Sequence, residues 1–184
     1  MIFSFFIFHS PILLLKIIMI FYETIFNAFN AQKINYIVVG GVAFNLLGGS
    51  RSTFDLDILL EMNDENIQKT ILTLTKLGYQ PKQPVNPLDF AKKEVRDNWI
   101  YEKNMKAFNF FKNERSLEEV DIIIDSPIDY DNAIKDAETI KFNQFTIPII
   151  SLNNLILMKQ VSSRIKDKLD VEELEIMKNQ NNER

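Results

Sequence analysis

The chain has 184 residues, of which 46% are hydrophobic, so it can bury one core and does not require a second full domain. Its formal net charge of −4 provides no global positive field, and we expect no strong nonspecific binding to nucleic acid. Cysteine is absent and His9 is the only histidine, which excludes disulfides, thiolate nucleophiles and zinc sites made of Cys or His ligands.

The first 22 residues form a hydrophobic extension with a single charged side chain, Lys16. Pro11 and Lys16 interrupt it, no basic region precedes it and no small-residue cleavage site follows it, so it does not match a secretory signal. Three interpretations stay open: a misassigned start with Met19 as the true initiator, a membrane-associated anchor, or a packed N-terminal helix. The protein is expected in the cytoplasm, or at a membrane if the extension anchors it.

The segment behind the extension predicts a helix, a strand and a second helix in turn. Residues 22–32 place apolar side chains on one stripe, as in an amphipathic helix. A β-branched run then ends at Gly40 and Gly41, and the apolar stretch behind it has the density of a buried helix that ends at Gly48 and Gly49. A glycine turn thus joins a strand to a helix.

Residues 54–62 predict the next strand. Apolar side chains at Phe54, Leu56 and Ile58 alternate with Asp55 and Asp57, a pattern typical of a strand with one polar face. Both aspartates must then project from the same face.

The remaining two thirds of the chain predict further helices and strands. Residues 80–98 contain three prolines and are expected to be irregular, with a short helix or a mobile arm near their end. The other elements are a helix over 64–77, strands over 106–111 and 118–125 joined by a turn at 113–116, a short strand over 144–150, and a helical segment that Ser151 caps.

This order of elements predicts one α/β (α+β) domain, in which a short mixed β-sheet packs against helices and a helical C-terminal segment follows. The domain occupies residues 23–178, between the extension at 1–22 and a frayed tail at 179–184.

The aspartates carry the chemistry that the sequence suggests most directly. Asp55 and Asp57, on one face of a strand, can share one or two divalent cations, and magnesium or manganese would neutralise charge on a triphosphate. Asp121 would add a third carboxylate and act as metal ligand or general base if its strand lies beside theirs. Asp125 has the same strand parity and is the second choice for that role.

The glycine turn and the residues before the aspartate strand suggest a phosphate site. Gly40 and Gly41 would let backbone N–H groups approach a phosphate closely at a helix N-terminus. Arg51, Ser52 and Thr53 place a guanidinium and two hydroxyls near the expected phosphates. Each feature alone has a plainer interpretation as a turn or a solvated surface; their joint order favours a nucleotide site.

The residues from Val38 to Leu60, VVGGVAFNLLGGSRSTFDLDILL, resemble the signature of the DNA polymerase β-like nucleotidyltransferase superfamily. In that signature an apolar residue and two small residues precede an Asp-x-Asp between apolar residues. The run Arg51-x-Thr53-x-Asp55-x-Asp57 and the late segment SLNNLILMKQVSSRIKDKLDVEEL resemble, more narrowly, the small bacterial abortive-infection and type IV toxin (AbiEii-like) nucleotidyltransferases.

The resemblance implies a minimal nucleotidyltransferase fold and a set of site residues. Gly40, Gly41, Asp55, Asp57 and Asp121 would be catalytic or metal-binding. The late helix of that group carries a lysine followed by a Lys-Asp-x-x-Asp run, so Lys159 and Lys166 become candidates for contact with the triphosphate. A lysine on a helix face also serves to cover apolar surface, and that alternative stays open.

The sequence therefore predicts a metal-dependent nucleotidyltransferase that uses Mg²⁺ or Mn²⁺ and moves a nucleoside monophosphate from an NTP to a hydroxyl. The acceptor is left open among RNA such as a tRNA end, a protein and a small molecule, with the acidic charge disfavouring RNA. The toxin resemblance adds an antitoxin as a possible partner. The alternative is an inactive member of the same fold that binds a nucleotide or a protein.

Overall fold

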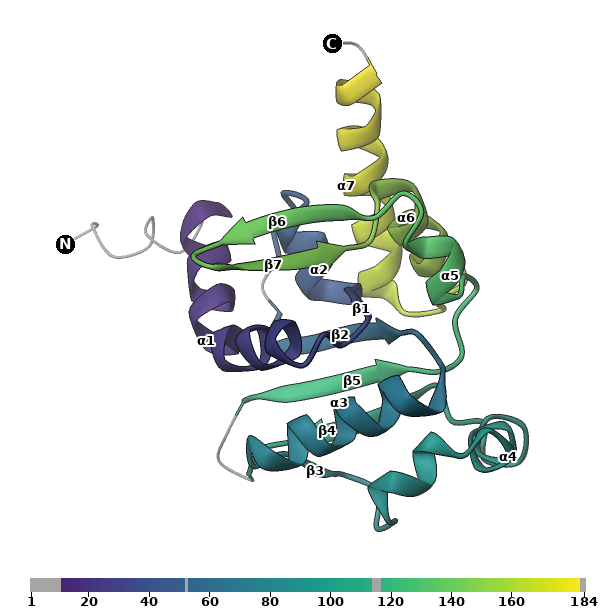
Figure 1. Ribbon diagram of the computed structural model, residues 1–184. Helices are drawn as coiled ribbons and strands as arrows, with labels where there is room; N and C mark the ends of the chain where they lie inside the picture. The colour runs from purple at the N-terminus through teal and green to yellow at the C-terminus, as the bar shows by residue number, and fades with distance from the viewer. Residues whose placement is uncertain (1–10, 52, 114–116, 183–184) are drawn as a thin grey trace, which may run out of the picture.

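The computed structural model describes residues 11–51, 53–113 and 117–182, with the backbone alone for 11–16, 181 and 182. Within these residues, seven strands form one mixed sheet in the order β3-β4-β5-β2-β1-β7-β6 (Figure 1). The strands are β1 (Tyr36–Val38), β2 (Asp55–Leu60), β3 (Gln80–Pro81), β4 (Ala107–Phe111), β5 (Glu119–Ile123), β6 (Glu138–Phe142) and β7 (Phe145–Ile149). The predicted α/β class is confirmed.

Helices pack against this sheet and against one another. They are α1 (Pro11–Ala31), α2 (Gly40–Leu46), α3 (Asp64–Lys76), the 3₁₀ helix η2 (Pro87–Ala91), α4 (Lys93–Lys103), α5 (Tyr130–Ala133), α6 (Leu152–Gln160) and α7 (Ile165–Asn182). Helix α1 contacts α2, α3 and β7, whereas α6 contacts α2 and α7. The distal part of α7 projects away from the rest of the domain (Figure 1).

The register of β2 and β5 fixes where the aspartates lie. Strand β2 runs antiparallel to β1 and parallel to β5. In the β2–β5 ladder Asp57 lies opposite Asp121, and the next pair, Leu56 and Val120, is fully buried. Because side chains alternate between the two faces of a sheet, burial of the apolar pair sends both aspartates to the other face. The strand of Asp121 therefore lies beside the strand that carries Asp55 and Asp57.

The proline-containing stretch 80–98 is more regular than predicted, and of the two alternatives for its end the structure has the short helix. The stretch contributes β3, η2 and the first part of α4. Phe90 stacks on Phe108 of β4 with ring centroids 4.8 Å apart, and Trp99 lies 5.3 Å from the same ring. These aromatic contacts tie the stretch to the sheet, an effect that local proline content does not reveal.

The C-terminal half contains more elements than the sequence predicted. The strand predicted over 144–150 is one arm of the hairpin β6–β7, whose other arm has mostly exposed side chains at the sheet edge and so lacks an apolar signal. The helical segment is divided into α6 and α7, and its predicted cap is confirmed because Ser151 Oγ accepts the N–H of Asn154 at 3.3 Å. The turn predicted at 113–116 falls largely on 114–116, outside the described residues.

Helix α1 crosses the end of the hydrophobic extension. It is continuous through residue 22, and Ile18 and Met19 on it are 4% and 0% exposed. Residues 1–10 of the extension lie outside the described residues. Within the described part of the chain, no helix is both long enough and apolar enough to cross a membrane.

Tyr22 joins α1 to the strands that carry the aspartates. Its side chain is 1% exposed, and its hydroxyl donates to the backbone oxygens of Phe54 and Glu119, the latter at 3.0 Å. Glu119 begins β5 and Phe54 directly precedes β2. One hydroxyl thus bridges the starts of the two strands.

Replacing Tyr22 with phenylalanine should lower the free energy of unfolding by about 1–2 kcal/mol, because two partly buried carbonyls lose their donor while the ring remains. Urea denaturation measures the loss. Tyr101→Phe is the matched control, since Tyr101 is 81% exposed and should change stability little. Equal stability of the two variants would contradict the bridging role of Tyr22.

Candidate active site

The turn between β1 and α2 is built around Gly40. Gly40 has a φ of +63°, and a Cβ added to it would lie 1.9 Å from Oδ2 of Asp57. A Cβ added to Gly41 would lie 2.8 Å from Oγ1 of Thr53. The backbone N–H of Gly41 donates to Asp57 Oδ2 at 3.3 Å. The two glycines therefore let the start of α2 sit directly on the aspartate strand, where any side chain would collide.

The predicted carboxylates occupy one face of the sheet at the neighbouring strands β2 and β5. Asp57 and Asp121 are directly opposite each other, which in a β-ladder places their backbones about 4.8 Å apart. Asp55 lies one same-face position earlier, at the exposed start of β2. Oδ1 of Asp121 is buried and has no hydrogen-bond partner within the described part of the chain.

Asn109 of β4 stands beside the carboxylates and was not predicted. It pairs with Asp121 in the β4–β5 ladder, and its Oδ1 accepts a hydrogen bond from Nε2 of Gln83 at 2.9 Å. Gln83 thereby fixes the orientation of the Asn109 amide, so that the N–H₂ group of Asn109 is free to donate to Asp121. The only sequence signal for this role was a polar residue inside the apolar strand 106–111.

The two central carboxylates are electrostatically strained. Burial, followed by the negative charge of Asp121, raises the pKa of Asp57 to about 7. Burial and the charge of Asp55 also raise the pKa of Asp121, against a hydrogen bond from Asn109 that lowers it. Like charges held this close favour either a shared proton or a bound cation.

These carboxylates suit a hard divalent cation. Within the described residues no three His, Cys, Asp or Glu side chains form a metal cage by themselves. Mg²⁺, however, is commonly held by one or two protein carboxylates together with waters and substrate phosphates. The unpartnered Oδ1 of Asp121 and the raised pKa of Asp57 fit a pair of donors to such a cation.

A cleft of about 730 Å³ opens over the carboxylates. Asp57, Asp121 and Gly40 line its sheet side, and the α6–α7 region lines the other. Lys106 and Asp125 form an ion pair that also lines it. The volume is in the range of small-ligand pockets.

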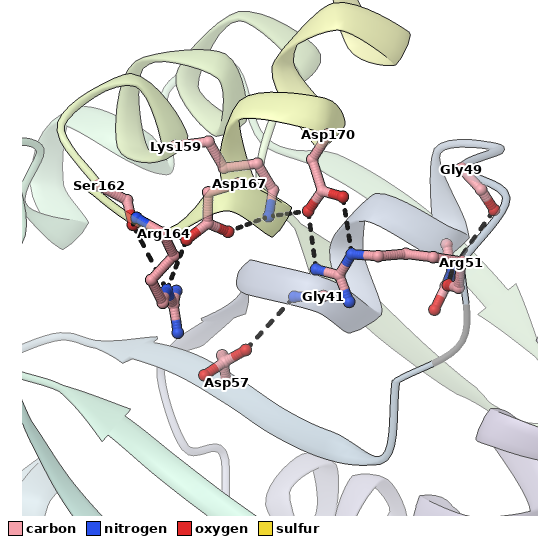
Figure 2. Close-up of polar contacts among 10 residues, drawn as sticks. Gly41, Gly49, Arg51, Asp57, Lys159, Ser162, Arg164, Asp167 and Asp170 are labelled. Carbon is pink, nitrogen blue, oxygen red and sulfur yellow. Dashed lines mark hydrogen bonds and ion pairs between the residues drawn. The ribbon is translucent and has the colours of Figure 1, made fainter.

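A largely buried group of ion pairs forms part of the α6–α7 wall of the cleft (Figure 2). Lys159 is 5% exposed, and its Nζ lies 3.2 Å from Asp167 and 2.6 Å from Asp170. Arg51 binds Asp170 with two parallel hydrogen bonds, from Nε at 2.6 Å and from Nη2 at 2.7 Å. We call these four residues the buried ion network.

The network neutralises its own charges. Burial alone raises the pKa of Asp170, but hydrogen bonds from Arg51 and Lys159 outweigh that effect and hold it below the ordinary value. For Asp167, burial again raises the pKa, and the hydroxyl of Ser162 and the charge of Lys159 lower it further than burial raises it. A buried pair of this kind is costly to break, because the remaining charge has no partner.

The structure brings together most of the predicted site residues, in two separate groups. Gly40, Gly41, Thr53, Asp57 and Asp121 meet at the sheet. Arg51 and Lys159 belong to the buried ion network, and Lys159 also lines the cleft, whereas the exposed Lys166 does not. Ser52 lies outside the described residues. The chemical roles of all these residues stay predictions.

A comparison with known protein families matches residues 16–184 to the family described as "Nucleotidyltransferase of unknown function (DUF6036)". The chain belongs to this family. The nucleotidyltransferase resemblance of the Gly-Gly and Asp-x-Asp segment is thereby confirmed at the superfamily level. The matched range begins inside the hydrophobic extension. No curated protein matched this nucleotidyltransferase.

Two solved structures share the fold of this nucleotidyltransferase. The lincosamide antibiotic adenylyltransferase LnuA, in its lincomycin-bound structure, is similar with a TM-score of 0.55 and 19% sequence identity, over 85% of this chain and 96% of that one. An antigenic nucleotidyltransferase-like protein from Paracoccidioides brasiliensis gives a TM-score of 0.50 at 14% identity, over 89% of this chain and 74% of its own. At these identities the likeness concerns the fold.

The raised pKa of Asp57 predicts how the stability of this nucleotidyltransferase depends on pH. Between the ordinary value of 3.8 and about 7, the folded chain holds the Asp57 proton more tightly than the unfolded chain does. The contribution of this group to the free energy of unfolding therefore falls as pH rises through that window. Asp57→Asn stays neutral at every pH and escapes the loss.

In EDTA at about pH 8, Asp57→Asn should be on the order of 1–3 kcal/mol more stable than the wild type, and the difference should disappear near pH 4. Urea denaturation at the two pH values measures it. Glu172→Gln, at an exposed position on α7, is the control. A pH-independent difference between Asp57→Asn and the wild type would show that the charge of Asp57 is not strained in the fold.

Proposed function

We propose that this nucleotidyltransferase moves a nucleoside monophosphate from an NTP to a hydroxyl acceptor, with Mg²⁺ or Mn²⁺ at Asp57 and Asp121. The observation that carries the proposal is the β2–β5 register, which sets these two carboxylates side by side beneath the cleft. Asp55 would complete the group from the next same-face position of β2. Membership in a nucleotidyltransferase family supports the reaction class.

The residues around the carboxylates suit an anionic donor substrate. The glycine turn brings the backbone of α2 against Asp57, so a phosphate bound there would meet N–H groups without intervening side chains. Lys159 lines the cleft wall, and Asp167 and Asp170 neutralise its charge. A divalent cation on the carboxylates would supply charge neutralisation for the triphosphate as the transition state forms. The protein supplies the positioning.

The proposed reaction is a single displacement at phosphorus. The acceptor oxygen attacks the α-phosphorus and forms a new O–P bond, while the bond from that phosphorus to the bridging oxygen breaks and pyrophosphate leaves. The hydroxyl proton passes to a carboxylate. Asp121 would accept it through the carboxylate oxygen that does not hold the cation.

The acceptor is proposed among a small molecule, a protein hydroxyl and an RNA end. The fold likeness to an enzyme named as an adenylyltransferase of an antibiotic favours testing small molecules first. The net charge of −4 weighs against RNA. A toxin role with an antitoxin partner has weaker support, from the late motif that resembles the abortive-infection group. In this structure Lys159, Asp167 and Asp170 of that motif already contact one another in the buried ion network, where they stabilise the fold.

The proposal is tested by supplying each of the four NTPs with a labelled α-phosphate, Mg²⁺ or Mn²⁺, and separate pools of small metabolites and antibiotics, lysate protein and tRNA. Wild-type protein should release pyrophosphate and label one pool. Asp57→Asn combined with Asp121→Asn should reduce transfer on the order of 1,000-fold, because both metal-binding oxygens and the base are lost.

The control for this test is Glu138→Gln, an exposed position on the edge strand β6, which should transfer at the wild-type rate. Transfer by the double variant at the wild-type rate would disprove the assignment of the carboxylates. Tight NTP binding by the wild type without any transfer would indicate an inactive nucleotide-binding member of the family.

A further inference from the structure

Three cationic side chains line the cleft, and each of them contacts a carboxylate. Lys106 forms an ion pair with Asp125. Lys159 is enclosed by the two aspartates of the buried ion network. The third cation is Arg164, in the connection between α6 and α7, and no sequence signal identified it.

Arg164 presents most of its hydrogen-bonding capacity to the cleft. A single group, Nε, makes its contacts: 2.6 Å to Oδ2 of Asp167 and 3.4 Å to Oγ of Ser162. The two terminal nitrogens have no hydrogen-bond partner in the described part of the chain. Arginine carries five N–H donors, so four remain in one plane. The side chain is 65% exposed.

Asp167 fixes the direction in which these donors point. It is 2% exposed and is itself held by Lys159 and by the hydroxyl of Ser162, the latter at 2.6 Å. In the view of Figure 2 the guanidinium of Arg164 extends from the α6–α7 connection on the side of the strand that bears Asp57, and both residues line the cleft. A guanidinium group that is held through Nε keeps its orientation while its terminal N–H groups remain available to a ligand.

Charge and geometry together define what this fork would bind. The opposite wall of the cleft carries Asp57 and Asp121, which repel an anion unless a cation lies between. A nucleotide whose α-phosphate sits near the carboxylates has its outer phosphates farther along the cleft. Planar N–H pairs match the oxygens of such phosphates in a bidentate way.

We propose that Arg164 binds the β- and γ-phosphates of the NTP and holds the pyrophosphate as it leaves. The inference rests on the proposed nucleotidyl transfer and adds a residue to it. The competing explanation is a helix-end ion pair, because Arg164 and Asp167 are three residues apart at the start of α7. That ion pair explains the contact of Nε with Asp167, but it does not involve the two terminal nitrogens.

The test measures the affinity of the full chain for inorganic pyrophosphate, for each NTP and for the matching NMP, by calorimetry with Mg²⁺. Arg164→Ala should weaken pyrophosphate and NTP binding tenfold or more and leave NMP binding within twofold, because an NMP lacks the outer phosphates. Arg164→Lys keeps the charge without the fork and should lie between Arg164→Ala and the wild type. Lys168→Ala, at an exposed position on α7 outside the cleft, is the matched control and should stay within twofold for every ligand.

A purely structural role for Arg164 would lower NMP, NTP and pyrophosphate affinity by the same factor, and this result would overturn the inference. Wild-type pyrophosphate affinity in Arg164→Ala would also overturn it. Failure of the proposed function looks different, because the wild type would then transfer no label, whatever the affinities of Arg164→Ala. If the wild type transfers label and Arg164→Ala binds pyrophosphate and NTP with wild-type affinity, the role of Arg164 is wrong and the proposed function stands.

Discussion

The parallel pairing of β2 with β5 is the constraint on which the rest of the site depends. It aligns Asp57 with Asp121 on one face, while Leu56 and Val120 pack into the core on the other. A slip of one residue would bury the carboxylates and expose the apolar pair, so the core itself enforces the register. The glycine turn then adapts to Asp57 because Gly40 has no side chain to collide with it. Packing thereby keeps two like charges together that would otherwise separate.

The α6–α7 wall of the cleft is held in place by ion pairs between side chains of opposite charge. Arg51, Lys159, Asp167 and Asp170 bring the segment before β2 and the two C-terminal helices into one buried ion network. Lys159 is held between two carboxylates and Arg51 is held by one of them, so both serve first as structural cations. Arg164, which lines the same cleft, keeps its terminal N–H donors free of partners in the described part of the chain. The positioning of the wall is thereby separated from the proposed recognition of phosphates.

Much of the sheet side could be predicted from the sequence, because its signals are local. Two glycines after a β-branched run, and aspartates alternating with apolar residues, specify a turn and a polar strand face within a few residues. The role of Asn109 depends on cross-strand pairing, and that of Arg164 on the way two helices meet, which no local pattern encodes. Strand β6 was missed because its side chains are mostly exposed, and the stretch with three prolines was misjudged because aromatic stacking onto β4 overrides its local preference.

If Asp57 and Asp121 form one site for a divalent cation and a nucleotide, metal and NTP should bind there together. Electron paramagnetic resonance of Mn²⁺ titrated into the protein, with and without an NTP, is the decisive measurement because it counts bound metal and requires no knowledge of the acceptor. The NTP should strengthen Mn²⁺ binding to the wild type, and Asp57→Asn with Asp121→Asn should abolish this effect. Equal NTP-dependent Mn²⁺ binding by the double variant would show that these carboxylates do not hold the metal.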